Sequence, residues 1–493
     1  MDQRSDADQV VSAAQTIAPS NIHAGTVARP HQRIRRGTAT PNQTLAIVCI
    51  GIMLANLDLF IVNVALPDIA TDFGHAALDH LSWVLNAYAI AYAALLVFFG
   101  GLAERHRRDR SFLLGVALFT AASAACAGAD SVMTLVAFRI VQAAGAALMT
   151  PTSIGLLLAS FPPDRRAGAV RNWVAIGGLA AAAAPLIGGV LVTISWRWIF
   201  IVNVPVGLAA IVIGWWKLPW VPGHDVPRPN LIAALLVTAG IAALTFAIVK
   251  VNDWGWTAPG VAGVFAVSFV CLAAFVWHCL RARDPFIQPG LFRVRAFTGA
   301  ALVLTPYSMA FGATLFSAAV WGQTAWGWTA LKAGLVLAPG PFLVPITSLL
   351  FAGRLITRFG VAPVAIAGIA AFVGGLVTWA VFIGEEPNIP VVMVGIMLTG
   401  IGVGLTFPTL MGVAASSLPP SSFATGSAVI NMIRQAALAI GVAIFVAVVG
   451  SPASLSEQVS AYHLGWWIMA AITALGLIPI FLLVRPIRAL ERI

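Results

Sequence analysis

The sequence predicts an all-α polytopic membrane protein with about fourteen spans, and two observations support this class. Of its 493 residues, 60% are hydrophobic and only 9% are charged, so the apolar surface exceeds what a water-soluble domain could bury. Apolar runs of about 20 residues recur along the chain, each the length of one spanning helix. Such runs exclude an outer-membrane barrel, whose strands alternate polar and apolar residues over roughly ten positions.

The apolar runs define the predicted spans in order. They lie near residues 44–66, 81–103, 111–129, 132–161, 167–193, 198–216, 231–250, 258–280, 296–320, 330–356, 361–383, 391–411, 424–449 and 462–484. Residues 1–41 are polar and lack the apolar core of a signal peptide, so we expect a disordered cytoplasmic tail there. We then expect a six-helix bundle over 42–217, two inserted helices within 218–283, a second six-helix bundle over 284–485 and a cytoplasmic tail over 486–493.

Basic residues predict the orientation of the spans. Arginines collect in alternate loops, such as those around Arg105 and Arg281, whereas the opposite loops offer only Arg197, Lys250 and Lys332. Because basic residues accumulate on the cytoplasmic side, we expect both termini to be cytoplasmic. The net charge of +10 reflects this loop bias, and we expect no nucleic-acid partner.

Sequence motifs exclude several kinds of chemistry. The four cysteines lie in apolar runs without a Cys-x-x-Cys pair, so we expect neither a disulfide framework nor a metal site. The chain contains no Gly-x-x-x-x-Gly-Lys-Ser/Thr loop for a nucleotide. We therefore expect no cofactor and no enzyme activity, and an ion gradient or the solute itself must supply the energy for transport.

The two halves of the chain echo each other. Pro151 is followed by the pair Pro162-Pro163, and Pro408 is followed by Pro419-Pro420 at the same spacing, each between one apolar span and the next. Repeated bundles around a central site are typical of transporters that work by alternating access.

Two charges in the predicted spans lie at similar depth. Asp58 lies roughly 13 Å before the first span ends at Pro67, and Arg139 lies roughly 10 Å after the fourth span begins. If the two helices are neighbours, these side chains can form an ion pair. The pair could be purely architectural, but we favour proton coupling. Burial and a nearby arginine act oppositely on the pKa of a carboxyl group, so moving either influence between conformations would load and unload a proton.

Other polar residues within the spans are candidates for a substrate cavity. Arg434 has no acidic residue in the later spans to pair with, so it either binds an anionic or dipolar group or anchors neighbouring helices. The remaining candidates are Asn56, Asn63, Asn86, Tyr88, Tyr92, Gln142, Tyr307 and Asn431. Each of these could instead join helices through hydrogen bonds.

Several motifs resemble those of one known family. Leu57-Asp58-Leu-Phe-Ile-Val-Asn63-Val-Ala-Leu-Pro67 resembles the first-helix signature of the fourteen-span drug:proton antiporters of the major facilitator superfamily. The resemblance continues through Arg139-Ile-Val-Gln142, Ala184-Pro185-Leu-Ile-Gly188-Gly189 and Asn431-x-x-Arg434-Gln435. It implies a proton-coupled exporter of lipophilic compounds, with Asp58 as the proton carrier and Arg139 tuning it. Pro185, Gly188 and Gly189 would form the antiporter motif, a bend and close-packed seam that limits leakage.

Departures from the family pattern concern the loop after the second span. Gly100-Gly-Leu-Ala-Glu104-Arg105-His-Arg107-Arg108 is similar to the family's Gly-x-Leu-Ala-Asp-Arg-x-Gly-Arg, which implies a conformational latch formed by Glu104, Arg105 and Arg108. Glu104 replaces an aspartate and Arg107 a glycine that favours the turn. Phe60 stands where a threonine is usual, and Ala184 where a glycine is usual.

The resemblance also bears on the substrate. Family members that export divalent cations carry further membrane carboxylates in later spans, which this chain lacks. Neutral, weakly acidic or monovalent cationic lipophiles are therefore expected. Two alternatives stay open: the same fold could transport a lipid or another endogenous amphiphile, or the protein could be a non-transporting sensor or scaffold. We expect protons, lipophilic small molecules or lipids and the bilayer as partners, a monomer, and a bacterial inner (plasma) membrane location suggested by the composition.

Overall fold

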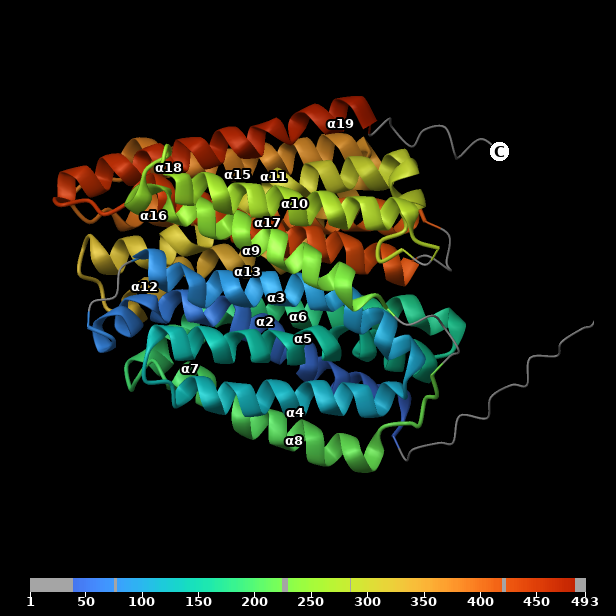
Figure 1. Ribbon diagram of the computed structural model, residues 1–493. Coiled ribbons are helices and arrows are strands. Elements are labelled where there is room, and N and C mark those ends of the chain that lie inside the picture. Colours follow the sequence, from blue (N-terminus) through green and yellow to red (C-terminus); the bar gives the residue numbers. More distant parts are fainter. Residues whose placement is uncertain (1–38, 75–77, 224–228, 284, 419–422, 484–493) are drawn as a thin grey trace, which may run out of the picture. The chain divides into compact units, whose positions relative to one another are not determined.

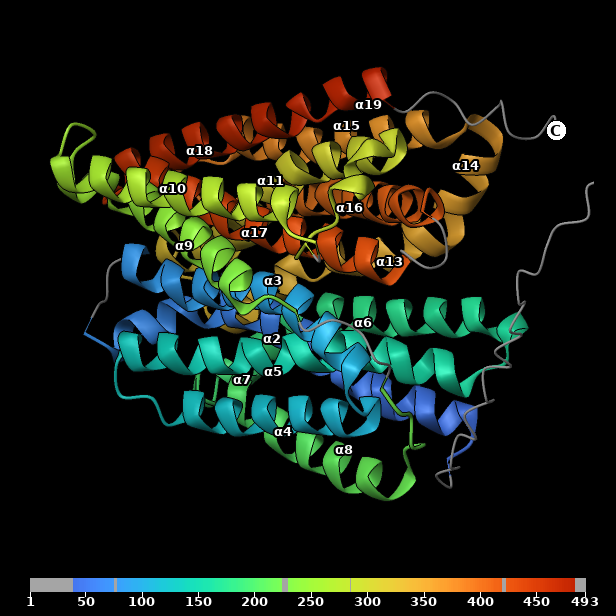
Figure 2. The same ribbon diagram turned by 45° about the vertical axis from the view of Figure 1, so that its right-hand side comes forward.

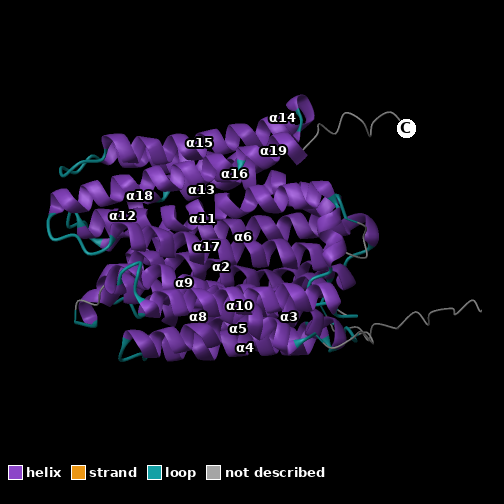
Figure 3. Cartoon of the chain, turned by 45° about the horizontal axis from the view of Figure 1, so that its top comes forward, coloured by secondary structure: helices purple, strands orange, loops and turns teal. Residues whose placement is uncertain are grey.

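The computed structural model describes residues 39–483 with the exception of 75–77, 224–228, 284 and 419–422 (Figure 1). The chain divides into two units, Met1–Arg35 and Arg36–Ile493. The first unit lies outside the described residues, as does the short tail expected at 486–493. The described residues form helices and loops, with no strand among them (Figure 3).

Helices follow one another along the whole described chain. The N-terminal half contains α2 (Pro41–Asp72), α3 (Leu78–Arg105), α4 (Arg108–Ala127), α5 (Val132–Ser160), α6 (Pro163–Val192), α7 (Trp198–Ile201) and α8 (Asn203–Lys217). The inserted pair is α9 (Leu231–Trp254) and α10 (Pro259–Arg281). The C-terminal half contains η1 (Pro289–Arg293), α11 (Arg295–Thr324), α12 (Ala330–Leu337), α13 (Pro339–Ile346), η2 (Thr347–Ala352), α14 (Gly353–Phe359), α15 (Val361–Phe382), α16 (Ile389–Ser416), α17 (Phe423–Val449), α18 (Leu455–Leu475) and α19 (Leu477–Leu483).

The predicted fold class is confirmed. Among the described residues, 13 helical stretches are long and apolar enough to cross a membrane, and the apolar part of α6, Ile176–Val192, is a shorter further one. The span expected at 330–356 is confirmed as one stretch, Ala330–Phe359, in which the helix is interrupted between α12, α13, the π-helical turn η2 and α14. Pro339 and Pro345 lie in this segment, and proline has no N–H to donate within a helix, which accounts for the breaks.

The two halves repeat the same helix packing. In the N-terminal half α5 packs on α3 and α4, α2 packs on α6, and α8 packs on α4 and α2. In the C-terminal half α16 packs on α13 and α15, α11 packs on α17, and α18 packs on α15 and α11. These pairs correspond one to one in chain order, as the proline spacing in the sequence predicts.

The halves meet through three sets of helices. α2 contacts α11, α3 contacts α17, and α6 contacts both α12 and α13. The inserted helices join only one of these seams, because α9 packs on both α3 and α17 and carries α10 on its other side (Figure 2). We call the end of the bundle at which α2, α6 and α11 finish the distal end, and the opposite end the proximal end.

Candidate functional site

Asp58 lies in an apolar stretch of α2, and three neighbouring helices supply its polar partners. α2 packs against α5 and α8, while α4 packs against both of those helices. This packing brings together Arg139 of α5, Ser123 of α4 and Asn203 of α8. The side chains of Asp58, Arg139 and Ser123 are completely buried, and that of Asn203 is nearly so.

The buried carboxylate accepts hydrogen bonds from three side chains. Arg139 Nη1 donates to Asp58 Oδ2 and, at 2.8 Å, to Gln142 Oε1. Gln142 Nε2 donates to Asp58 Oδ1 at 2.8 Å and to Ser123 Oγ at 2.9 Å. Asn203 Nδ2 donates to the same two oxygens, at 3.3 Å and 3.0 Å. The result is one connected network around a single ion pair.

Tyr88 and Val84 of α3 hold the guanidinium from the other side. Arg139 Nε donates to the carbonyl oxygen of Val84 at 3.2 Å, and the Tyr88 ring centroid lies 4.0 Å from Arg139 Cζ. Arg139 Nη2 and the Tyr88 hydroxyl are buried without a hydrogen-bond partner among the described residues. Cation–π contact therefore replaces part of the solvation that the arginine loses.

This arrangement makes the ion pair sensitive to protonation. All three donors point at carboxylate oxygens, so a proton on Asp58 would convert an acceptor into a donor and disturb the network. It would also leave Arg139 as a buried charge without its counter-ion, which is a costly state. A proton on Asp58 would therefore require the polar network around it to rearrange.

Ser123 and Asn203 did not emerge from the sequence as site residues. Each is a single polar residue in a long apolar run, where a role in helix packing is the usual one. Gln142, expected to line a cavity, lies instead in the Asp58 network.

A small central hollow lies between the two halves. Asn63 of α2 and Asn86 of α3 face Gly312 of α11 and Leu438 of α17 across it. Both asparagines were expected to line a substrate cavity. The other lining residues, including Phe60, are apolar.

The remaining cavity candidates lie outside the lining of this hollow. Asn56 packs against α6, where a methyl group on Gly177 would lie 2.7 Å from the Asn56 amide nitrogen. Tyr307 packs between two phenylalanines of α15 and α16, with ring centroids 4.8 Å and 5.3 Å away. Asn431 donates to the backbone oxygen of Ser427 at 2.9 Å within its own helix.

Tyr92 extends the aromatic contacts beside the ion pair. Its ring is stacked on that of Tyr88, with centroids 6.0 Å apart, and its hydroxyl lies 3.1 Å from the hydroxyl of Thr150. The Arg434 guanidinium lies 5.6 Å from the centre of the Phe407 ring and forms no ion pair among the described residues.

The predicted antiporter motif lies on the seam between α6 and the two helices α12 and α13. A methyl group on Gly189 would lie 2.9 Å from the carbonyl oxygen of Ala330, and one on Gly334 would collide with the carbonyl oxygen of Pro185. On the opposite side, a methyl group on Gly188 would lie 2.8 Å from Ile61 Cγ1 of α2. Glycine is therefore required for this close approach, which brings the halves together toward the distal end.

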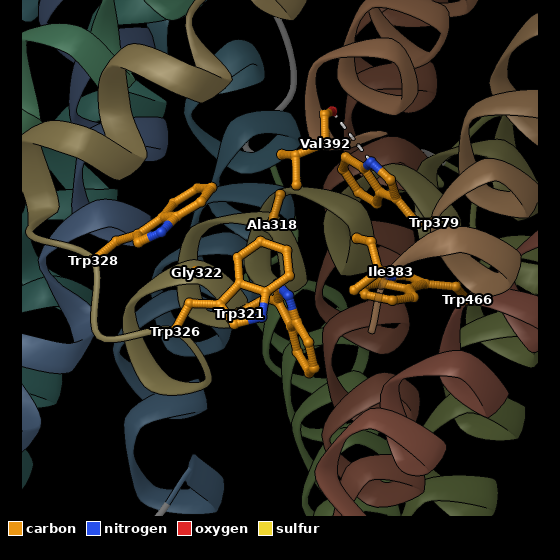
Figure 4. A pocket seen from close by; sticks show the side chains of 9 residues that line it. All are labelled: Ala318, Trp321, Gly322, Trp326, Trp328, Trp379, Ile383, Val392 and Trp466. Carbon is orange, nitrogen blue, oxygen red and sulfur yellow. Dashed lines mark hydrogen bonds between the residues drawn. The ribbon is translucent and has the colours of Figure 1, made fainter. Parts of the chain in front are cut away.

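A second, smaller hollow lies within the C-terminal half (Figure 4). Five tryptophans line it: Trp321, Trp326, Trp328, Trp379 and Trp466. Trp379 Nε1 donates to the carbonyl oxygen of Val392 at 3.2 Å, and Trp466 Nε1 donates to Ser317 Oγ at 3.0 Å. None of the predicted site residues lines this hollow.

Comparison with known proteins decides the family. Residues 48–324 and 300–492 match the family described as Major Facilitator Superfamily. The chain belongs to the major facilitator superfamily. It is 30% identical to the methylenomycin A resistance protein of Bacillus subtilis over 83% of this chain and 87% of that protein. It is 32% identical to the cephamycin export protein CmcT of Amycolatopsis lactamdurans over 87% of this chain and 89% of that protein.

Solved structures support the same fold at lower identity. An auto-inhibited peptide transporter of the POT family matches with a TM-score of 0.67 and 18% identity, covering 91% of this chain and 98% of its own. A D-xylose-proton symporter matches with a TM-score of 0.64 and 14% identity, covering 90% of this chain and 98% of its own. The protein is therefore a multi-pass membrane transporter of small molecules, as its export-protein relatives indicate, and not an enzyme.

The loop after α3 contacts the segment that follows α8. Arg107, which replaces the usual glycine, pairs with Asp109 at 2.6 Å, and its guanidinium lies 5.6 Å from the centre of the Trp220 ring. Arg108 donates its backbone N–H to the carbonyl oxygen of Val221 at 3.1 Å, and its side chain reaches the Gly155 carbonyl oxygen of α5 at 3.4 Å. The segment after α8 thus covers the proposed latch.

Other features of this loop bear on the latch. A methyl group on Gly223 would collide with the carbonyl oxygen of Arg105, so the covering segment approaches the loop closely. The side chain of Glu104 lies outside the described set. The roles of Glu104, Arg105 and Arg108 in a latch therefore stay a prediction.

Proposed function

We propose that this protein exports lipophilic small molecules across the bacterial inner membrane in exchange for protons, with Asp58 as the proton carrier and Arg139 as its counter-ion. The observation that carries the proposal is the fully buried ion pair with its three donors to the carboxylate. A buried pair adds little stability over an apolar packing, so its presence favours a functional role. Relatives named for antibiotic resistance and export support a small lipophilic cargo.

Alternating access would follow from the repeated halves. The distal end is held together by Gly189 against Ala330 and by Gln323 Nε2, which donates to the carbonyl oxygen of Val64 at 3.0 Å. Because basic loops accumulate on the cytoplasmic side, we propose that the distal end faces the outside and that both termini are cytoplasmic. We propose that the exporter works as a monomer and that the closed distal seam opens to release substrate.

The lining of the central hollow favours a small lipophilic cargo. Its lining residues are apolar apart from Asn63 and Asn86, which suits a lipophilic body that carries one small polar group. A lipid with two acyl chains would need a longer cavity or an opening between helices. The second candidate function, transport of an endogenous lipid, is supported by an observation of neither feature.

Substrate-induced proton movement in reconstituted vesicles tests the proposal. The native protein should release or take up protons when a neutral lipophilic dye is added under an imposed pH gradient. Asp58→Asn should abolish this signal. Asp253→Asn, which removes an exposed carboxylate that pairs with Lys250 at 2.6 Å, is the control and should retain it. An unchanged signal in Asp58→Asn would overturn the assignment of the proton carrier.

A further inference from the structure

The central hollow contains one side chain whose hydrogen-bonding groups are all unused. Asn86 is completely buried and lines the hollow, yet neither its amide nitrogen nor its amide oxygen has a partner among the described residues. A buried amide left in this state destabilises the protein, because it has lost its hydrogen bonds to water and gained none in return. A bound molecule that both donates and accepts would remove the cost.

The second asparagine of the hollow is in a different state. Asn63 Nδ2 already donates to the carbonyl oxygens of Phe60 at 3.2 Å and Leu59 at 3.5 Å within α2. Its amide N–H groups are thus held by its own helix. Asn86 is therefore the better placed of the two to bind a ligand.

The rest of the lining is apolar and contains an aromatic edge. Phe60 stands where the family pattern has threonine, and its ring meets that of Phe311 edge to face, with centroids 6.2 Å apart. Leu59, Leu85 and Leu438 continue the apolar wall. Such a wall suits a lipophilic body with one small polar group.

The nearest charges make the hollow unfavourable for cations. Arg434 lies one helical turn before Leu438 on α17, roughly 6 Å along the axis, and has no ion-pair partner among the described residues. The carboxylate of Asp58 is already paired with Arg139. The interior around the hollow therefore carries an excess of one positive charge, whose field is weakly screened there.

We propose that the hollow binds uncharged or singly negative lipophiles, that Asn86 hydrogen-bonds their carbonyl, amide or carboxylate group, and that the site excludes permanent cations. This inference rests on the proposed function and narrows it, because lipophilic monovalent cations are removed from the expected substrates. Asn86 is thereby a specificity residue and has no part in proton transfer.

Three probes that share one ring system test the charge preference. We would measure binding of naphthylacetamide, naphthylacetate and naphthylmethyl-trimethylammonium to the detergent-purified full chain by titration calorimetry. The amide and the carboxylate should bind at least tenfold more tightly than the ammonium. Arg434→Gln should weaken carboxylate binding and improve ammonium binding. Equal or tighter binding of the ammonium, or no binding of any probe to monodisperse protein, would overturn the inference.

Two leucine substitutions test the residue assignment. Asn86→Leu should weaken amide binding roughly tenfold, the ratio that corresponds to about 1.4 kcal/mol, and should leave ammonium binding unchanged. The protein should remain folded, because the change removes an unsatisfied buried amide. Asn63→Leu is the matched control and should weaken amide binding by less than threefold. Equal effects of the two substitutions would contradict the role of Asn86.

Transport assays separate this inference from the proposed function. If the protein binds the probes with this selectivity but shows no proton-linked transport, the antiport proposal fails and the binding site stands. If proton-linked transport is intact but prefers the cation, the site assignment fails and antiport stands.

Discussion

The ring of Tyr88 lies face-on over the guanidinium of Arg139, with 4.0 Å between the ring centroid and Cζ. Tyr88 in turn stacks on Tyr92, with ring centroids 6.0 Å apart. Both rings belong to α3, a helix that contacts both α5 and α17.

Tyr88 provides a direct test of the cation–π contact. Tyr88→Phe should retain transport and thermal stability, because the hydroxyl of Tyr88 has no partner among the described residues and the ring is kept. Tyr88→Leu should lower stability by roughly 2 kcal/mol, the upper range for a desolvated contact, and should reduce proton-linked transport. Thermal unfolding and vesicle assays on both variants check this. Equal loss in the phenylalanine variant would show that the hydroxyl matters instead.

The ion pair should behave as a unit in a double-mutant cycle. Arg139→Met alone should destabilise the protein by roughly 3 to 5 kcal/mol, because Asp58 is left as a buried charge without compensation. Asp58→Asn combined with Arg139→Met should recover most of this stability, since no charge remains. Proton-linked transport should stay absent in the double variant, because it has no proton carrier. Recovery of proton-linked transport together with stability would assign the pair a purely architectural role.

The distal seam predicts a strong effect of one methyl group. Gly334→Ala places that group against the carbonyl oxygen of Pro185 and should force α6 and α12 apart. We expect transport to fall at least tenfold, because the distal end can no longer close. Gly178→Ala is the control in α6, since a methyl group there meets nothing within 4 Å. Comparable losses in both variants would indicate that these helices do not tolerate an added methyl group at any position, and would contradict a specific role of the seam.

A second double-mutant cycle tests the contact between the loop after α3 and the segment after α8. Arg107→Ala and Trp220→Ala should show a coupling of about 0.5 to 1 kcal/mol in thermal unfolding, as expected for a partly exposed cation–π pair. Both variants should alter the transport rate to a similar extent, since each frees the same loop. Strictly additive effects would mean that the two side chains do not act together.

The sequence was a good guide to the spans and to the existence of a buried pair. Depth along two helices placed Asp58 and Arg139 at similar levels, and the structure brings them into contact. The helix repeat was also visible in the proline spacing. These features depend on length and hydropathy, which the bilayer imposes on every span.

Other parts of the site depend on tertiary contacts that leave no local pattern. Ser123 and Asn203 are single polar residues in apolar runs, and only the packing of α4 and α8 on α2 and on each other reveals them as partners of Asp58. The same packing places Gln142 in the ion-pair network, whereas the sequence predicted that it would line the cavity. The covering of Arg107 by Trp220 is likewise invisible in sequence, because more than 100 residues separate them.

Substrate exchange in Asp58→Asn tests the central claim most directly. Proton coupling at Asp58 predicts that this variant exchanges labelled for unlabelled substrate across vesicle membranes with no pH gradient, because exchange needs the substrate site alone. The same variant should fail to accumulate substrate when a pH gradient is imposed. Accumulation at the native level in Asp58→Asn would contradict the account.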